Sequence, residues 1–251
     1  MNKSISSPLS AVMRLIYSIY AWIVFSVCTF TATLCAFIIP GLDNRRRSVT
    51  ACARTIFALA GIQVSVDGLH KIPSSGCVIV ANHASYLDGI LLKAYLPARF
   101  SYVIKNEMQR VPITAFFLKR IGSKFVDRFD PSRSARDMRH LLKAAQTGES
   151  LAFFPEGTFT LEPGLGRFRA GAFAAAISAK VPIVPVVISG SRYILPENTL
   201  LPYHGDMRID ILDPIGPSEH SYTNARDLAN LARSRILDVL DEPDLLVKSS
   251  I

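Results

Sequence analysis

The sequence predicts an α/β fold with a mixed, largely parallel central sheet, flanked by helices and preceded by an N-terminal membrane-anchoring helical segment. Three observations support this prediction. Short apolar runs typical of buried strands alternate along the chain with stretches typical of helices. One uncharged run near the N-terminus is long enough to enter a membrane. The strongest polar motifs directly follow apolar strands, where sites form in parallel sheets.

The predicted strands are short apolar or alternating segments, several of them bounded by turn-forming residues. They lie at residues 62–66, 77–81, 100–104, 124–126, 151–154, 183–188 and 207–212. The predicted helices are longer, and the third of them begins at Asp130-Pro131, a typical helix start. They lie at residues 88–96, 113–120, 130–146, 170–179 and 224–240. Strands that alternate with helices in this way favour a largely parallel sheet.

The N-terminal apolar run contains no charged residue between Leu15 and Ile39 and ends at Pro40-Gly41. About 20 apolar residues suffice to cross a bilayer, so this run is predicted to span with some tilt. A signal peptide is disfavoured because its apolar core is only roughly 7–15 residues long and precedes a small-residue cleavage site. The following stretch, residues 49–62, is also apolar. Two helices that dip into one leaflet without crossing are therefore the alternative.

The chain carries a formal charge of +8 and a pI near 9.5, which suits an acidic partner such as anionic lipid or a phosphate-bearing substrate. Basic residues are more numerous after the apolar run than before it, which places the main domain on the cytoplasmic side of a membrane. These residues are Arg45, Arg46, Arg47 and Arg54. The four cysteines form no CxxC or Cys/His cluster, so neither a disulfide framework nor a metal site is expected.

The first motif with chemical potential runs from Asn82 to Asp88, directly after the strand predicted at 77–81. A histidine at a strand end and an aspartate at a helix start can meet across one turn. The Asp88 carboxylate then accepts the proton of one ring nitrogen of His83, which leaves the other nitrogen as a base for a substrate hydroxyl. The alternative interpretation is a histidine that caps the helix and an aspartate that is only an N-terminal charge.

The second motif is a turn formed by Glu156, Gly157 and Thr158, again directly after a predicted strand. Glycine lets the backbone approach a ligand closely, and successive N–H groups in such a turn bind anions. Lys105 and Arg128 lie at similar strand boundaries, where such cations bind phosphate. An ordinary turn and two solvated surface cations are the alternatives.

In combination, four blocks resemble the glycerolipid acyltransferase family, the 1-acylglycerol-3-phosphate acyltransferases and their relatives. Asn82-His83 to Asp88 is similar to its NHxxxxD block, and residues 122–128 are similar to its second block. Residues 154–158 match its FPEGT block, and residues 181–186 match its apolar, proline-containing fourth block. The resemblance extends over about residues 62–189, and the N-terminal anchor also fits.

The resemblance implies an anchor and connecting helix over residues 1–61 and an acyltransferase domain over residues 62–251. His83 is implied as the general base and Asp88 as the residue that orients it. The free hydroxyl of a membrane lysophospholipid attacks the thioester of acyl-CoA or acyl carrier protein directly, with no metal and no further cofactor. Lys105, Arg128, Glu156, Gly157 and Thr158 are implied to hold the acceptor, most simply 1-acyl-sn-glycerol 3-phosphate.

One position departs from the family pattern. Many members follow FPEGT with Arg-Ser, and that arginine is linked to phosphate binding, whereas this chain has Phe159-Thr160. Arg167 or Arg169 is a possible substitute. Otherwise the acceptor is another lysolipid, such as a lyso-aminolipid.

Activities of other classes find less support. A serine hydrolase needs the G-x-S-x-G nucleophile elbow, which is absent from the sequence. His83 has no HExxH partner for a metal hydrolase, and the other histidines are scattered. A purely structural or binding protein of the membrane is compatible with the basic charge. No RNA-binding pattern or zinc spacing is present, so nucleic acid is not an expected partner.

Overall fold

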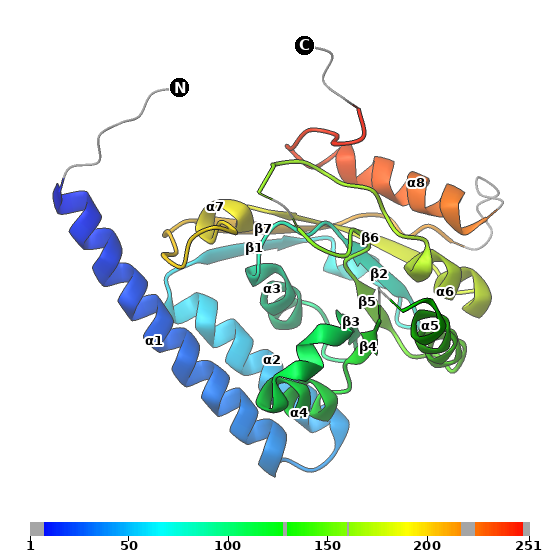
Figure 1. Cartoon of the computed structure of the whole chain (residues 1–251), viewed down its shortest axis with the longest axis horizontal. Helices are drawn as coiled ribbons and strands as arrows, with labels where there is room; N and C mark the ends of the chain where they lie inside the picture. The colour runs from blue at the N-terminus through cyan, green and yellow to red at the C-terminus, as the bar shows by residue number, and fades with distance from the viewer. Residues whose placement is uncertain (1–7, 128–129, 160, 217–223, 248–251) are drawn as a thin grey trace.

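In a computed structural model of the chain, a seven-stranded sheet lies between two layers of helices (Figure 1). The structure describes residues 8–127, 130–159, 161–216 and 224–247. The strand order is β1-β7-β6-β2-β5-β3-β4, and all neighbouring pairs are parallel except β6 and β7. The strands are β1 (Gln63–Asp67), β2 (Val78–Ala81), β3 (Ser101–Lys105), β4 (Lys124–Val126), β5 (Leu151–Phe153), β6 (Ile183–Ser189) and β7 (Asp206–Ile211). The prediction of a mixed, largely parallel sheet is confirmed.

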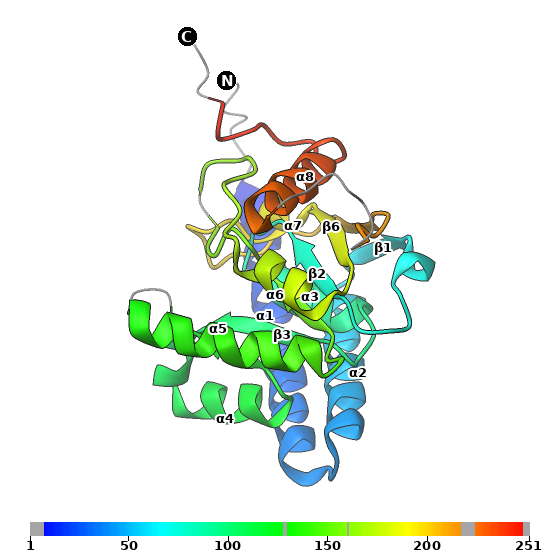
Figure 2. The ribbon, with the colours of Figure 1, turned by 90° about the vertical axis from the view of Figure 1, so that its right-hand side faces the viewer.

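Successive side chains of the central strands point to opposite faces of the sheet, so the core is divided between the two faces. Val78 and Val80 of β2 pack on one face with helices α5 (Pro131–Gln146), α6 (Gly171–Ala179) and α8 (Ala225–Leu237). Ile79 and Ala81 of the same strand pack on the other face, against α2 (Leu42–Leu59) and α3 (Leu87–Tyr95). Figure 2 shows α5 and α6 beside the sheet and α2 on its opposite side. A central strand covered on both faces has to be apolar throughout, as its sequence is.

The predicted elements agree with the observed ones to within a few residues at each end. Helix α5 begins where Asp130-Pro131 predicts, and the Asp130 carboxylate accepts hydrogen bonds from the N–H groups of Ser132 and Arg133. Three short elements were not predicted, because one turn of helix leaves almost no periodic pattern. They are η1 (Leu69–Lys71), η2 (Asn106–Arg110) and α7 (Ser191–Ile194).

The N-terminal region forms two helices, α1 (Pro8–Ile38) and α2, which pack against each other beneath the sheet (Figure 1). Within α1, residues 11–38 are long and apolar enough to cross a membrane by length and composition. Large apolar side chains of α1 are exposed along much of its length, among them Phe30 and Phe37. Helix α2 instead buries Phe57 completely in the core beneath the sheet.

Helix α1 makes hydrogen bonds to the rest of the protein near both of its ends. Near its start, the Arg14 guanidinium donates to the Leu201 carbonyl, at 3.0 Å. Near its end, the Arg120 guanidinium donates to the carbonyl of Ala36, at 2.9 Å. Arg120 belongs to α4 (Pro112–Arg120), which packs beside this end of α1. The long apolar helix therefore lies along the domain and does not extend away from it.

The basic residues that follow α1 have structural contacts beyond their charge. The Arg46 side chain is only 4% exposed, and its guanidinium donates to the carbonyls of Ile121 and Arg99. The Arg54 guanidinium donates to the Ala94 carbonyl at the end of α3. These contacts hold α2 against the domain, so Arg46 and Arg54 have a structural role in addition to their charge. All four cysteines are free, as predicted.

Candidate active site

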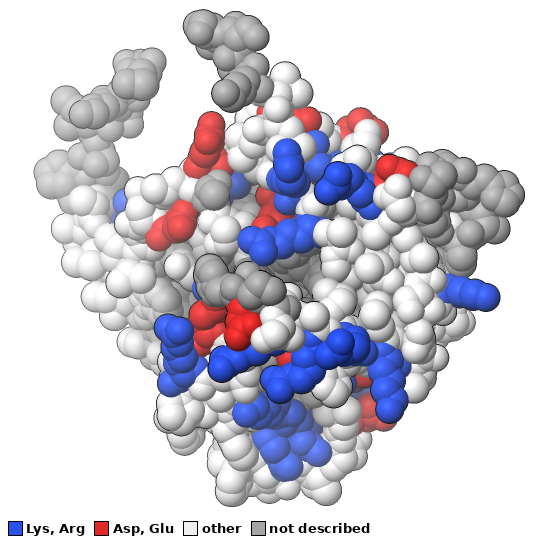
Figure 3. Space-filling model, turned by 45° about the vertical axis from the view of Figure 1, so that its right-hand side comes forward, with Lys and Arg blue, Asp and Glu red and all other residues white. Residues whose placement is uncertain are grey.

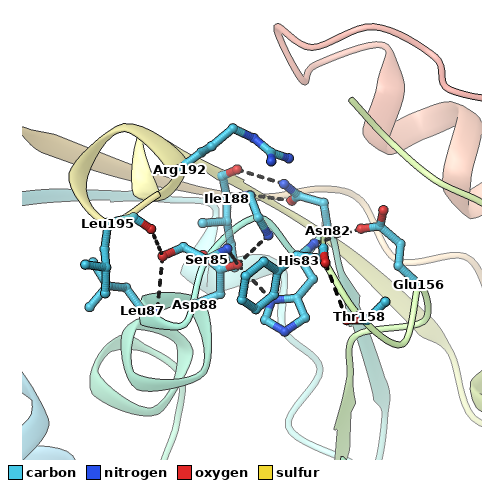
Figure 4. A network of polar contacts seen from close by, with 12 residues as sticks. Asn82, His83, Ser85, Leu87, Asp88, Glu156, Thr158, Ile188, Arg192 and Leu195 are labelled. Atoms are coloured by element: carbon cyan, nitrogen blue, oxygen red, sulfur yellow. Dashed lines mark hydrogen bonds and ion pairs between the residues drawn. The ribbon is translucent and has the colours of Figure 1, made fainter. Parts of the chain in front are cut away.

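The predicted histidine and aspartate meet at the carboxyl end of β2 (Figure 4). His83 Nδ1 lies 2.9 Å from Asp88 Oδ2. The same oxygen accepts the backbone N–H groups of Ala84 and Ser85, at 2.6 and 2.8 Å. Asp88 is fully buried in the first turn of α3, whereas the His83 side chain is 18% exposed. The aspartate therefore fixes one edge of the imidazole and leaves the other nitrogen available to a ligand.

Asn82 locks the end of β2 to β6, a role that the sequence did not reveal. Its side-chain amide donates to the Ile188 carbonyl at 2.9 Å, and its side-chain oxygen accepts the Ile188 N–H at 2.7 Å. This two-way pairing continues the sheet beyond the last residue of β2 (Figure 4). Since His83 is the next residue, the pairing limits where its backbone can lie.

Glu156 joins this backbone to the loop that follows β5. One carboxylate oxygen accepts the His83 N–H and the other accepts the Gly166 N–H, both at 2.8 Å. Burial raises the pKa of Glu156, and these two hydrogen bonds oppose that rise. Gly157, next in the chain, has φ +87°, and its N–H closes the turn on the Phe154 carbonyl. A side chain is strained in that conformation, which explains glycine here.

Aromatic rings enclose the imidazole. Phe154 stacks on His83 with ring centroids 4.2 Å apart and planes inclined by 19°. Phe159 meets His83 edge-on at 4.7 Å and meets Tyr86 edge-on at 4.8 Å. Phe159 thus covers the imidazole at the position where the family pattern has a cation. An aromatic wall excludes water from the base but supplies no charge for a phosphate.

A cavity of 560 Å³ extends from His83 under the sheet, between β3 and β5 and the helices α1 to α4. Its lining is mostly apolar and includes Phe25 and Cys28 of α1 and Phe117 of α4. Lys105, at the carboxyl end of β3, lies exposed at its rim. The volume lies within the range that binds drug-sized apolar ligands.

Only some of the predicted site residues line the cavity. His83, Lys105, Gly157 and Thr158 all line the cavity, and the Thr158 side chain is exposed there. Arg128 lies outside the described residues. Arg167 and Arg169, the possible substitutes for the missing arginine, are exposed on the loop that follows the Glu156 turn. Arg169 also donates its backbone N–H to the Pro155 carbonyl.

The C-terminal segment holds that loop in place. Arg233 of α8 donates to the carbonyls of Leu165 and Gly166 and forms an ion pair with Asp244. Glu242 accepts the Gly164 N–H at 2.7 Å and pairs with Arg192 at 3.1 Å. The contacts of Arg233 with the loop and of Glu242 with Arg192 join residues far apart in the sequence, so a single-sequence pattern does not reveal them.

The arrangement suits proton removal from a ligand hydroxyl. A carboxylate holds one nitrogen of an imidazole, and the other faces an apolar cavity that has a cation at its rim. In the described ranges, no group of three or more His, Cys, Asp or Glu side chains is placed to hold a metal ion.

Known proteins share the fold and much of the sequence. A 1-acyl-sn-glycerol-3-phosphate acyltransferase of Haemophilus influenzae is 30% identical over 74% of this chain and 80% of its own length. A chloroplast 1-acyl-sn-glycerol-3-phosphate acyltransferase of Arabidopsis thaliana is 32% identical over 71% of this chain. The chain spans about half the length of that plant relative, 49%.

A crystal structure of the 1-acyl-sn-glycerophosphate acyltransferase PlsC from Thermotoga maritima has the same fold, with a TM-score of 0.76. The similarity covers 91% of this chain and 95% of the other at 20% sequence identity. The family model named Acyltransferase matches residues 63–189, about half of the chain and all of the strands and turns that form the site. The chain belongs to the Acyltransferase family.

Proposed function

We propose that the protein transfers a fatty acyl group from a thioester to the free hydroxyl of 1-acyl-sn-glycerol 3-phosphate, forming phosphatidic acid. The observation that carries this proposal is the His83–Asp88 pair, 2.9 Å apart, at the mouth of a largely apolar cavity. The printed activities of the bacterial and plant relatives support the same reaction. Residues 62–251 act as the catalytic domain in this proposal, and residues 1–61 act as the anchor.

The geometry supports direct attack by the acceptor. Asp88 holds the proton on His83 Nδ1, so Nε2 is the free base. Nε2 removes the proton of the acceptor hydroxyl as its oxygen bonds to the thioester carbonyl carbon. The carbon–sulfur bond then breaks, and the leaving thiolate takes the proton back from the imidazolium. Each step is complete without an acyl-enzyme.

The acceptor headgroup is proposed to lie at the rim. Lys105 supplies a cation there, and Arg128 and the turn of Glu156, Gly157 and Thr158 are the other proposed contacts. Glu156 acts through position, because both of its oxygens already hold backbone N–H groups. Phe159 in the place of the family arginine favours a second candidate, a lysolipid acceptor without a phosphate monoester, such as a lyso-aminolipid.

The donor is proposed to be acyl-CoA or acyl carrier protein. Both present a long acyl thioester and acidic groups, and this chain has a net charge of +8. Figure 3 shows Lys and Arg side chains gathered in a band across one face of the molecule. Such a band suits either donor as well as an anionic membrane surface.

Membrane placement is proposed to be monotopic, with the domain on the cytoplasmic side. A helix bonded to the domain near both ends cannot cross a bilayer without carrying that domain through it. The alternative with two helices in one leaflet therefore fits α1 and α2 better than a spanning helix. An apolar pocket on the outer surface supports this placement. It is formed by Phe30, Leu34 and Phe37 of α1 with Ile113 and Phe116 of α4.

The test compares purified wild-type protein with the His83→Ala and His70→Ala variants. Labelled acyl-CoA or acyl carrier protein is offered with 1-acyl-sn-glycerol 3-phosphate or a lyso-aminolipid. We expect phosphatidic acid as the main product, loss of transfer by about 10²–10⁴-fold in His83→Ala, and little change in His70→Ala, whose histidine is exposed on η1. Persistent transfer by His83→Ala disproves the base assignment. A strong preference for the lyso-aminolipid favours the second candidate.

A further inference from the structure

The cavity has a second polar region, away from His83 and toward the amino ends of the parallel strands. Tyr102 of β3 pairs with Ala152 of β5, two residues before Phe154, which stacks on His83. At the strand rise this places Tyr102 roughly 7 Å below the level of the imidazole. Lys93 lies five residues beyond Asp88 on α3, about 7.5 Å along the helix axis. We call Lys93, Tyr102 and Ser123 the cavity floor; all three line the cavity.

Lys93 is an unusual residue for such a place. The residue is only 8% exposed, and its ammonium lies 5.7 Å from the centre of the Tyr102 ring. Within the described part of the chain, no carboxylate forms an ion pair with it. Burial, and to a lesser extent the charge of nearby Arg46, lowers the pKa of Lys93 to about 8. A buried amine without an anion is costly to the folded protein.

The two hydroxyl groups of the floor are also unsatisfied. The Tyr102 and Ser123 hydroxyls are buried, and neither has a hydrogen-bond partner among the described residues. Buried polar groups in native proteins are nearly always paired, and those that are not paired call for an explanation. Two such hydroxyls, beside a buried ammonium that forms no ion pair with the described residues, indicate that a ligand completes this part of the cavity.

Neighbouring charged residues do not complete the floor, because they are engaged elsewhere. Arg46 donates to the carbonyls of Ile121 and Arg99. Glu149, which forms an ion pair with Arg46, also pairs with Lys124 at 2.9 Å and accepts a hydrogen bond from the Ser101 hydroxyl. The floor is therefore left with donors in excess of acceptors.

We propose that Lys93, Tyr102 and Ser123 bind a hydroxyl group carried near the middle of a fatty acyl chain, so that this cavity selects hydroxylated chains over unsubstituted ones. The inference rests on the proposed function only in taking the cavity as the site of the acyl chain. A chain hydroxyl accepts a hydrogen bond from the Lys93 ammonium and donates its own proton to the Tyr102 or Ser123 oxygen. It thereby satisfies the donors without adding a charge to an apolar cavity.

A hydroxyl fits better than a carboxylate. A second ion would lose its hydration in a cavity whose lining is mostly apolar, and one ammonium repays that loss poorly. The depth of the floor sets the position on the chain. An extended chain advances roughly 1.2 Å per bond, so a floor about 7 Å from the reaction centre meets a hydroxyl near the seventh carbon. A hydroxyl on the second or third carbon stays at the level of His83.

The test measures binding in the His83→Ala protein, where no transfer confuses the readout. Three long-chain fatty acids of equal length displace a fluorescent fatty acid: an unsubstituted one, a 3-hydroxy one, and one hydroxylated at about the seventh carbon. We expect the mid-chain hydroxy acid to bind about tenfold more tightly than the other two, as one charge-assisted hydrogen bond allows. Lys93→Met added to the same protein removes the difference, and Tyr102→Phe and Ser123→Ala each reduce it.

Equal affinity for all three acids, or a preference that survives Lys93→Met, overturns the proposal and indicates that water alone occupies the floor. If Lys93→Met does not fold, as judged by circular dichroism, Tyr102→Phe and Ser123→Ala decide the matter, since each removes only one oxygen. Failure of the proposed function has a different signature. A wild-type protein that keeps the hydroxyl preference but transfers no acyl group contradicts the function and leaves the binding site in place.

Discussion

The mouth and the floor of one cavity show opposite treatments of buried polar groups. At the mouth, Oδ2 of Asp88 accepts the imidazole of His83 and two backbone N–H groups, and Glu156 accepts two more N–H groups, while Asp88 Oδ1 is buried without a partner among the described residues. At the floor, two buried hydroxyls have no hydrogen-bond partner, and the buried Lys93 forms no ion pair, in the described part of the chain. The two regions share helix α3, which carries Asp88 at the mouth and Lys93 at the floor, so one helix supports both arrangements.

The difference teaches what each region is for. Paired groups hold the base in one orientation before the substrate arrives, which is what catalysis of proton transfer requires. Unpaired groups raise the free energy of the empty protein, and a ligand that pairs them gains affinity. The mouth is thus organised in advance, whereas the floor is completed on binding. The following predictions test this contrast, beginning with the largest expected effect.

Replacing Asp88 with Asn attacks the organisation of the mouth. The amide keeps the size of the carboxylate but has no negative charge. Its oxygen therefore holds the imidazole N–H and the two backbone N–H groups less strongly than the carboxylate oxygen does. We expect kcat to fall by about 10²–10⁴-fold with little change in KM. Steady-state acyl transfer measures this. Asp213→Asn, whose side chain is 78% exposed, is the control. A loss below about tenfold contradicts a role for Asp88 in orienting the base.

Glu156→Ala removes the support beneath His83. Two backbone N–H groups lose a charged acceptor. In partial compensation, the folded protein no longer has to bury a carboxylate. We expect the free energy of unfolding to fall by about 3 kcal/mol, together with most of the transfer activity. Denaturant unfolding in detergent gives the value, with exposed Glu197→Ala as the matched control. Glu156→Gln keeps one acceptor, so its loss should be smaller; an equal loss argues against the hydrogen bonds as the cause.

Lys93→Met should stabilise the protein in a pH-dependent way. At pH 7 the amine is protonated in both folded and unfolded chains, and the lowered pKa of about 8 means that burial of the charge costs the folded state about 3 kcal/mol. As pH rises from 8 towards 10.5, the folded protein loses this proton first and the cost disappears.

The methionine variant should therefore exceed the wild type in unfolding free energy by up to about 3 kcal/mol at pH 7, with a margin that narrows above pH 8. Unfolding curves at several pH values measure the margin. Lys143→Met, an exposed lysine of α5, should show no such trend. A margin that stays constant with pH shows that Lys93 is not a buried cation.

Lys105→Met should weaken acceptor binding without slowing the chemistry. The exposed ammonium at the rim is proposed to contact the phosphate, and a charge-assisted hydrogen bond contributes about 1.5–3 kcal/mol. The KM for 1-acyl-sn-glycerol 3-phosphate should rise by about tenfold or more, with kcat nearly unchanged. Lys71→Met, on η1, serves as the control. If KM does not move, the phosphate lies elsewhere.

Much of the fold follows from the sequence because each central strand is an unbroken apolar run. The run before Asn82 and the run before Phe154 could not be solvated strands, and their polar successors had to lie at one sheet edge. The proximity of His83 and Asp88 followed from the same reasoning, and the structure places them in contact.

Other parts of the site could not be predicted. Lys93 lies in a helix that has a buried face, yet a lysine in a sequence is assigned to solvent by default. Its burial depends on α1, α2 and α3 meeting beneath the sheet, which involves contacts between residues far apart in the chain. The burial of Arg46 could not be predicted either, because its partners Arg99 and Ile121 lie more than fifty residues away.

The most direct test of the central claim is a double-mutant cycle on the transfer rate, with His83→Ala, Asp88→Asn and the variant that carries both changes. If the two residues act as one base, the double variant should be about as slow as His83→Ala alone, because an aspartate without its imidazole has nothing left to orient. A double variant slower by the product of the two single losses would show that His83 and Asp88 act independently and would contradict the account.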